Sequence, residues 1–229
     1  MTRIWWLVFA LAVLVAGCAA TPQRPHYVLP PDAGVGAPLT NEQIAAARTT
    51  PGPPVLVVHP NGNHVTGLPY PKSCPRQPGD DPRLPVRVCT PGSVRDDITQ
   101  DNIGQTICST TWTTDVIRPP KAETDRFKGY VMAAYGVPPS MRSRTELDHH
   151  VPLTLAGSND VTNFDAQVSD IPNASPPFRN TKDDVERRLN AAVCTHRVTL
   201  AAAQWAIAVN WTTAEANLGL HTVATQPTR

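Results

Sequence analysis

The sequence carries almost no net charge. Its 229 residues include 20 Lys and Arg residues and 19 Asp and Glu residues, which leaves a formal charge of +1 at pH 7. Proteins that bind nucleic acid over a broad surface usually have a basic domain or face, so any phosphate contact in this chain must be local. The candidates are Arg142, Arg144, Arg179, Lys182, Arg187 and Arg188. Acidic residues interleave with the last three, and a mixed, solvated helix face explains that pattern equally well.

The most apolar run of the chain is short for a membrane span, which needs about 20 residues. Ile4 to Val15 follows Arg3 and is typical of an export signal. Val15-Ala-Gly-Cys18 then matches a bacterial lipobox, in which a peptidase cuts before the cysteine and the thiol is acylated. We therefore expect a signal peptide over residues 1–17 and an exported, cell-membrane lipoprotein anchored through lipid on Cys18, since two or more acyl chains make such anchoring stable.

Proline is dense from Cys18 to residue 88, and this predicts a lipidated tether. Prolines fix the backbone and remove hydrogen-bond donors, so long helices and central strands are excluded there. The segment is interpreted as an extended, semi-rigid spacer. Val55 to Val58 has strand character and could pack on the domain as an added strand. The domain itself is expected over residues 89–212, with a flexible tail over residues 213–229.

Four cysteines remain once Cys18 is assigned to lipid. An even number in an exported chain suggests two disulfides, and four cysteines allow three pairings. The favoured arrangement joins Cys74 to Cys89, which closes a proline-rich loop, and Cys108 to Cys194, which ties the start of the domain to its last helices.

Helical and strand patterns surround the central stretch. We expect a short helix over residues 96–105, a strand over residues 111–117 and a helix over residues 124–135, in which Phe127, Val131 and Ala134 recur at helical spacing. Another helix should begin near Thr181 with acidic residues in its first turn. A mostly apolar helix over residues 200–211 should be buried against it.

The stretch from Thr145 to Phe164 contains the candidate chemistry. Adjacent side chains of a regular strand point to opposite faces, so Asp148 and His149 share a pocket only if the strand twists or ends there. Pro152 supports a strand end, because proline cannot donate to a sheet ladder. A loop, a second strand and a helix follow. This unit could bring Asp148 and Asn180 to one divalent ion, with His149 beside it holding a water.

The ordered residues Asp148-His149, Val151-Pro152, Gly157, Asn163-Phe164 and Asn180 resemble the HNH endonuclease superfamily. The resemblance implies an α+β fold with a small ββα-metal core, supporting helices and disulfides. It also implies metal-dependent hydrolysis of phosphodiesters in nucleic acid, with DNA as the expected partner. No protein partner is inferred.

The resemblance also implies a role for each site residue. Neutral His149 would accept a proton from the attacking water, because the pKa of imidazole lies near the working pH. Asp148 and Asn180 would hold one hard divalent cation, Mg²⁺. Asn163 would hold the loop at the site without being a ligand.

Two neighbours have supporting roles in this interpretation. His150 is expected to pack or to contact phosphate rather than to catalyse, and Glu146 either accepts a hydrogen bond behind Asp148 or is a solvated strand residue.

The chain departs from the HNH pattern in two ways. It has no pair of C-x-x-C motifs for structural zinc, which is compatible with disulfides in an oxidising compartment. Phe164-Asp165-Ala166 stands where an exported subgroup has Leu-Trp-Pro. The alternative hypothesis is therefore a non-catalytic envelope lipoprotein that uses a degenerate HNH scaffold for binding.

Overall fold

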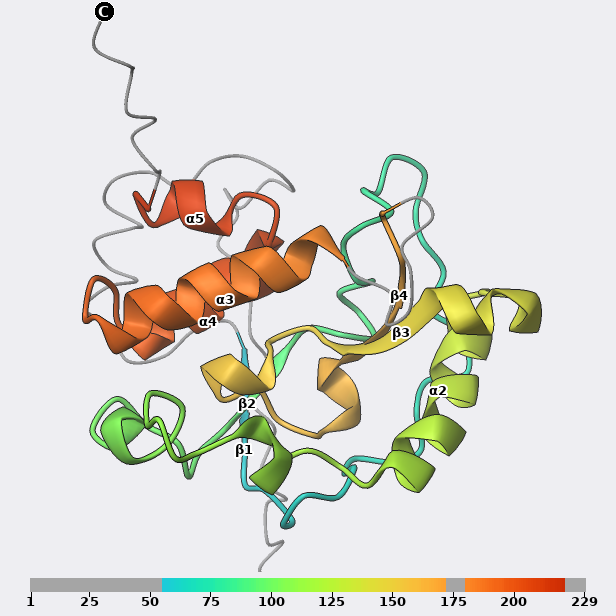
Figure 1. Cartoon of the computed structure of the whole chain (residues 1–229). Coiled ribbons are helices and arrows are strands. Elements are labelled where there is room, and N and C mark those ends of the chain that lie inside the picture. Colours follow the sequence, from blue (N-terminus) through green and yellow to red (C-terminus); the bar gives the residue numbers. More distant parts are fainter. Residues whose placement is uncertain (1–54, 172–179, 221–229) are drawn as a thin grey trace, which may run out of the picture.

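Two small sheets lie at the centre of an α+β fold (Figure 1). The computed structural model describes residues 55–171 and 180–220. Strand β1 (Leu56–Val58) pairs in parallel with β2 (Ser93–Arg95), and β3 (Thr145–His149) pairs antiparallel with β4 (Phe164–Val168). The pairing of β1 with β2 confirms that Val55 to Val58 adds a strand to the domain.

Within the described residues, four α-helices surround these sheets: α2 (Lys121–Ala134), α3 (Thr181–Cys194), α4 (Leu200–Asn210) and α5 (Ala214–Asn217). Short 3-10 helices connect them: η1 (Ile103–Gln105), η2 (Thr114–Val116), η3 (Pro139–Arg144), η4 (Leu153–Leu155) and η5 (Val161–Asn163). The predicted periodicity of α2 is confirmed, because Phe127, Val131 and Ala134 are buried. Gly136 has a φ of 69° just after its end, a conformation that glycine adopts without a steric cost.

The β3–β4 hairpin has α2 on one face and the start of α3 at the other. On the α2 side, Phe164 and Ala166 of β4 belong to the same apolar cluster as Phe127 and Val131. On the other side, Lys182 in the first turn of α3 reaches β3. The hairpin is therefore the element that separates two different environments for its side chains.

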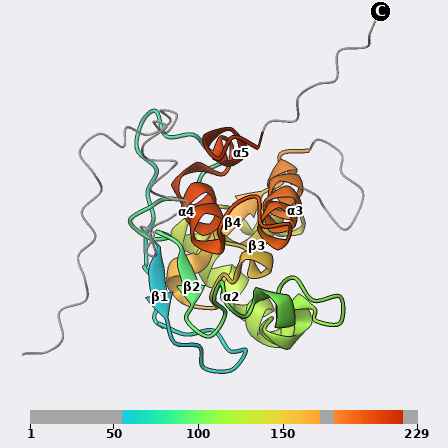
Figure 2. The ribbon, with the colours of Figure 1, turned by 90° about the vertical axis from the view of Figure 1, so that its left-hand side faces the viewer.

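The larger apolar cluster is formed by α3 and α4 packing on η4 and β2. Figures 1 and 2 show α3 and α4 side by side. Leu189 and Val193 of α3 and Ala203 and Ile207 of α4 are fully buried. The prediction that the last long helix is buried is therefore confirmed.

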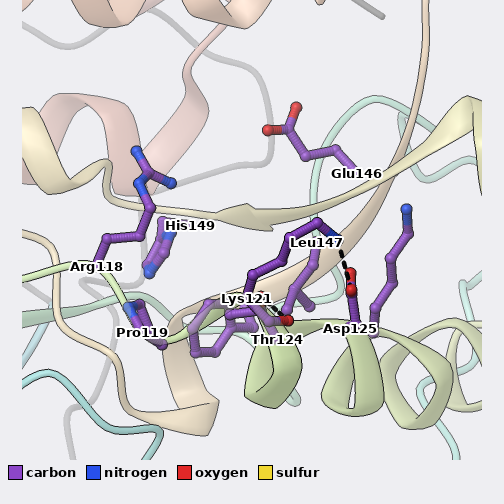
Figure 3. Close-up of a pocket in the computed structure, with 10 residues that line it drawn as sticks. Arg118, Pro119, Lys121, Thr124, Asp125, Glu146, Leu147 and His149 are labelled. Atoms are coloured by element: carbon purple, nitrogen blue, oxygen red, sulfur yellow. Dashed lines mark hydrogen bonds and ion pairs between the residues drawn. The ribbon is translucent and has the colours of Figure 1, made fainter. Parts of the chain in front are cut away.

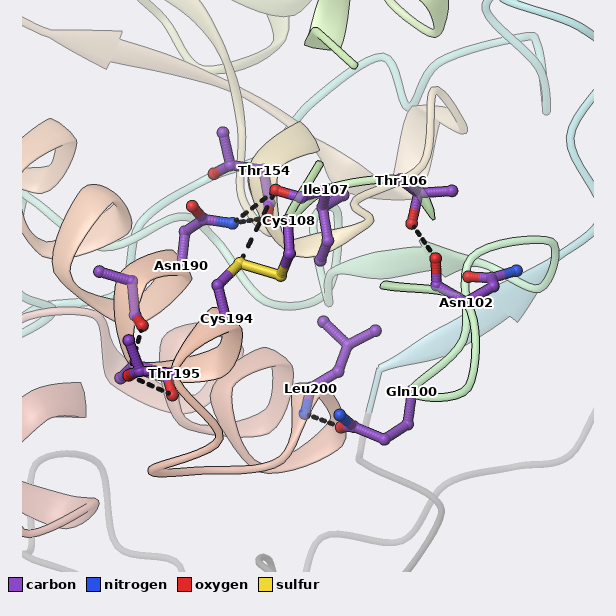
Figure 4. Close-up of a disulfide and its surroundings, with 12 residues drawn as sticks. Gln100, Asn102, Thr106, Ile107, Cys108, Thr154, Asn190, Cys194, Thr195 and Leu200 are labelled. Carbon is purple, nitrogen blue, oxygen red and sulfur yellow. Dashed lines mark hydrogen bonds between the residues drawn. A yellow bond between two sulfur atoms is a disulfide. The ribbon is translucent and has the colours of Figure 1, made fainter. Parts of the chain in front are cut away.

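Both favoured disulfides are present. Cys74 bonds to Cys89 beneath α2, and Cys108 bonds to Cys194 at the end of α3 (Figure 4). Beside the second bond, the Asn190 amide donates to the Thr154 carbonyl at 2.8 Å. The Cys108–Cys194 bond thus links the η1 region to α3, in agreement with the expectation from the sequence.

The packed domain begins earlier and ends later than predicted. Residues 55–88 were expected to belong to the tether, but Val65, Tyr70 and Val86 are buried in the cluster under α2. The backbone of this segment forms loops instead of long helices or strands, as its prolines require. The proline-rich composition therefore did not indicate that these side chains are buried. The segment from residue 213, expected to be a tail, likewise contains α5. Ala214 in this helix and Leu218 directly after it are both fully buried.

Two predicted elements differ from the structure. Residues 96–105 contain only η1 at their end, because the segment before it folds in turns closed by Asn102. Residues 111–117 contain η2 in place of a strand.

The signal peptide, Cys18 and residues 221–229 lie outside the described residues. Within residues 55–171 and 180–220, no helix has the length and apolar character that a membrane crossing requires.

Candidate active site

The register of the hairpin places Asp148 and His149 on opposite faces. Asp148 pairs with Asp165, and His149 pairs with Phe164. The His149 ring packs on the Phe164 ring with centroids 4.4 Å apart, whereas Asp148 bonds to Lys182 of α3. The strand does end at His149, as expected, but it stays regular up to that residue, so the two side chains enter different surroundings.

A single amide orients the His149 ring. Nε2 of His149 lies 3.0 Å from Oδ1 of Asn159, and Nδ2 of Asn159 donates to the Ile117 carbonyl at 2.7 Å. Because a carbonyl can only accept, this second bond identifies which end of the amide is NH₂ and turns the oxygen toward the ring. Nε2 must therefore carry the proton and Nδ1 the lone pair.

Burial keeps the His149 ring neutral. It lowers the pKa of His149 to about 3, and the positive charges of Arg118 and Lys182 lower it further, while the bond to Asn159 acts in the opposite direction. The ring is only 8% exposed. Within residues 55–171 and 180–220, Nδ1 has no hydrogen-bond partner. The site therefore presents a neutral imidazole with an available lone pair.

Asn163 holds the loop between the two strands. Its Oδ1 accepts from the backbone N–H groups of Ser93 and Val151, and its Nδ2 donates to the carbonyls of Val151 and Ser158. The side chain is fully buried. Gly157 permits the same tight turn, since a Cβ there would lie 1.8 Å from the Val151 carbonyl oxygen. These contacts correspond to the loop-holding role expected for Asn163.

Asp148 meets a buried ammonium group. Lys182 Nζ donates to Asp148 Oδ2 at 2.7 Å, to the His149 carbonyl at 2.9 Å and to Glu186 Oε1 at 2.5 Å. These contacts use the three protons of the ammonium. Burial alone lowers the pKa of Lys182, but Asp148, Glu186 and Asp165 together raise it above the usual value. Lys182 is therefore the positive charge that Asp148 contacts at this face of the hairpin.

Asn180 begins α3 and has other partners. Its Oδ1 accepts from the Asp170 N–H at 3.2 Å, and its Nδ2 donates to Gln167 Oε1 at 2.8 Å. Its backbone N–H donates to Asp183, which completes the first turn of the helix. Asn180 is the helix N-cap, so α3 begins at Thr181, as expected.

The predicted metal ligands do not fit a divalent ion as their side chains lie. Asp148 is paired with Lys182, and the amide of Asn180 is bonded to Gln167 and Asp170. Among the residues that the structure describes, no three His, Cys, Asp or Glu side chains converge as metal ligands. Binding of Mg²⁺ by Asp148 and Asn180 stays a prediction.

His150 and Glu146 are placed as neighbours of the site. His150 points away into the core, where its Nε2 donates to the Ala208 carbonyl at 2.9 Å. It is 2% exposed, in accordance with a packing role. Glu146 is half-buried, and burial followed by the charge of Asp148 raises its pKa to about 8. Asp165 on the same side also has a pKa raised to about 8, by burial first and then by Asp148.

A pocket of about 420 Å³ opens beside His149, between β3 and the first turns of α2. Arg118, Lys121 and Lys128 contribute positive charge to its lining, Asp125 and Glu146 contribute carboxyl groups, and Leu147 and Phe164 contribute apolar surface. Figure 3 shows Arg118 and His149 close together at one end, with Glu146 on the other side of the strand. This face of the hairpin can receive a small anionic group next to the imidazole.

Most of the basic residues proposed from the sequence have structural partners. Arg187 pairs with Asp184 and Arg188 pairs with Glu215, which agrees with a mixed helix face. Arg179 lies outside the described residues. Sequence reasoning missed Asn159 and Arg118 as site residues. The available signals were a second asparagine in the loop of Asn163 and an arginine directly before two prolines.

Comparisons with models of protein families, with curated proteins and with solved structures found no match for this chain.

Proposed function

We propose that this protein hydrolyses phosphodiester bonds of nucleic acid, with DNA as the substrate, through an HNH-like site with His149 as the general base. The observation that carries the proposal is the state of the His149 ring. It is neutral, its Nε2 proton is held by Asn159, and it borders a pocket with three cationic side chains. The order of hairpin and helix, with Asn163 holding the loop, supports the HNH-like ββα core.

The proposed reaction begins with a phosphodiester in the pocket and a water molecule between phosphorus and Nδ1 of His149. Nδ1 accepts the proton as the water oxygen attacks, which forms the new P–O bond while the bond to the leaving oxygen breaks and that oxygen takes a proton from solvent. Asn159 keeps Nε2 protonated throughout, so Nδ1 is the nitrogen available to act as the base. Asn163 maintains the loop that carries Asn159.

A pKa of about 3 makes His149 a weak base in the free protein. A bound phosphodiester brings a negative charge next to the ring, and a nearby opposite charge favours protonated imidazole. Substrate binding therefore raises the pKa of His149 toward the working pH, where a general base is most effective. The imidazole becomes a competent base only when the substrate is in place.

A binding role on the same scaffold is the second candidate. The observation that favours it is the pairing of Lys182 with Asp148, which occupies a predicted metal ligand. In that case the pocket binds a nucleic acid without cutting it. Export and anchoring through lipid on Cys18 belong to both candidates and rest on the sequence alone.

The test is cleavage of supercoiled plasmid DNA by the full chain, purified in detergent. Wild type, His149→Ala and Asn159→Ala are compared with Mg²⁺, with Mn²⁺ and with chelator, and an RNA of similar length is tested in parallel. We expect nicking by wild type, loss with His149→Ala and a large reduction with Asn159→Ala.

The control is His64→Ala, which removes an exposed imidazole; neither His64 nor its partner Glu123 lines the pocket. Its activity should equal that of wild type. No cleavage under any metal condition refutes the hydrolase and leaves the binding role. Cleavage by His149→Ala at the wild-type rate refutes the assignment of the base. Dependence on added metal decides whether the predicted Mg²⁺ takes part.

A further inference from the structure

The three cationic side chains that line the pocket beside His149 differ in their partners. Lys121 is neutralised by Asp125, with Nζ 2.5 Å from Oδ2. Lys128 donates to the carbonyl of Arg142, and its pKa is lowered by burial and by the charge of Arg142. Arg118 remains; Figure 3 shows it beside the imidazole of His149, and its charge lowers the pKa of that ring.

Arg118 keeps most of its donor capacity. Its ion pair with Asp115 spans 3.9 Å between exposed side chains, and one further contact, from Nη2 to Thr114 Oγ1, measures 3.3 Å. An exposed pair at that distance contributes little, because solvent screens it. A guanidinium carries five N–H donors in a planar fork that suits two oxygens of one phosphate. Arg118 can therefore bind a phosphate without breaking a strong contact.

The backbone at Arg118 is tied to the catalytic ring. The Asn159 amide that orients His149 also donates to the carbonyl of Ile117, the residue before Arg118. Pro119 and Pro120 follow, and proline restricts both its own φ and the residue before it. Ile117 is buried. The segment therefore holds Arg118 at a defined place relative to the imidazole.

The same end of the pocket contains the start of α2, a helix of 14 residues whose lining residues include Lys121 and Thr124. The N-terminus of a helix favours negative charge. This adds to the guanidinium of Arg118, whereas His149, neutral and with its lone pair on Nδ1, contributes no positive charge. The guanidinium and the helix N-terminus thus both favour an anion beside the imidazole.

We propose that Arg118 binds the scissile phosphate next to His149 and supplies the positive charge that the neutral imidazole lacks. The inference rests on the proposed function for the reaction, but the phosphate site can be tested without it. During attack the phosphate oxygens gain negative charge, and a positioned guanidinium stabilises that charge more strongly than it stabilises the ground state. Arg118 therefore acts both in substrate binding and in the chemical step.

The experiment measures binding of a fluorescent single-stranded oligonucleotide to the full chain in chelator, by anisotropy over a range of salt concentrations. Arg118→Ala should weaken binding about tenfold and reduce the salt slope by about one. The matched control is Arg126→Ala, an exposed arginine on α2 that does not line the pocket. It removes the same charge and should change binding less than about twofold. His149→Ala should bind as tightly as wild type.

The outcomes separate the two proposals. Equal binding by Arg118→Ala and Arg126→Ala overturns the phosphate site, and so does no binding by the wild type. Selective loss with Arg118→Ala together with no cleavage by wild type retains the phosphate site and refutes the hydrolase. If wild type cleaves DNA, Arg118→Lys should lower kcat more than it raises KM, since it keeps the charge and loses the fork. Unchanged kcat in Arg118→Lys and Arg118→Ala would show that Arg118 has no role in the chemical step.

Discussion

Replacing Asn163 by alanine should destabilise the protein more than replacing an exposed asparagine by alanine does. The side chain is fully buried and joins β2, the end of β3 and the loop before η5. Its four hydrogen bonds all go to backbone groups of Ser93, Val151 and Ser158. Alanine leaves these groups without a partner in a place where water does not replace it.

The magnitude follows from the number of bonds. A net contribution of about 1 kcal/mol per hydrogen bond gives a loss of about 4 kcal/mol in the free energy of unfolding. Unpaired buried groups cost more, and relaxation of the loop offsets part of this. For a domain of this size the loss lowers Tm by about 8 to 16 °C. With an m-value of about 2 kcal/mol/M, the urea midpoint falls by about 2 M.

Urea unfolding at pH 7, followed by tryptophan fluorescence, measures this loss. The matched control is Asn102→Ala, which removes two exposed hydrogen bonds, to Thr99 and Asp97, and should cost less than about 1 kcal/mol because water replaces them. Asn163→Asp tests the donor half of the amide, since it directs a second oxygen at the carbonyls of Val151 and Ser158. It should be at least as unstable as Asn163→Ala. Equal stability of the Asn163→Ala and Asn102→Ala proteins, or a stable Asn163→Asp protein, refutes the reasoning.

Three further predictions concern the buried charge, the imidazole and the longer disulfide. Lys182→Met should lower the free energy of unfolding at pH 7 by about 3 to 5 kcal/mol, because it leaves buried carboxylates unpaired. Lys121→Met, at an exposed pair, should leave the free energy of unfolding almost unchanged. Equal urea midpoints of the two variants would contradict this. The His149 ring, with a pKa lowered to about 3, should show no titration by NMR between pH 5 and 8 in the folded protein and should titrate at about pH 6.5 in urea. Because only the unfolded chain takes up that proton, His149 lowers the unfolding free energy as the pH falls below about 6.5, and a folded-state titration near neutrality would refute the burial argument. Serine at both Cys108 and Cys194, which are 86 residues apart, should cost about 4.5 kcal/mol in calorimetry, and a loss below about 1 kcal/mol would contradict the entropic estimate.

Residues close together in the sequence specified much of this fold. The spacing of Phe127, Val131 and Ala134 defined α2, and the apolar run from Leu200 defined α4. Helical periodicity depends on neighbours three and four residues apart, so a sequence shows it directly. The hairpin and both disulfides were also predictable, because short apolar runs, turn residues and cysteine count limit the choices, whereas the role of Asn163 was implied by the resemblance to the HNH pattern.

Tertiary packing decided what each site residue meets. Lys182 reaches Asp148 over 34 positions, and the Asn159 amide joins His149 to Ile117, 42 positions away from Asn159. No local pattern encodes such pairs, since they depend on how α3 and the segment before α2 pack on the hairpin. The sequence alone determined that an acidic residue and a histidine end β3. Only the fold placed them on opposite faces, one against a buried ammonium and the other beside a cationic pocket, because neighbouring side chains of a regular strand point in opposite directions.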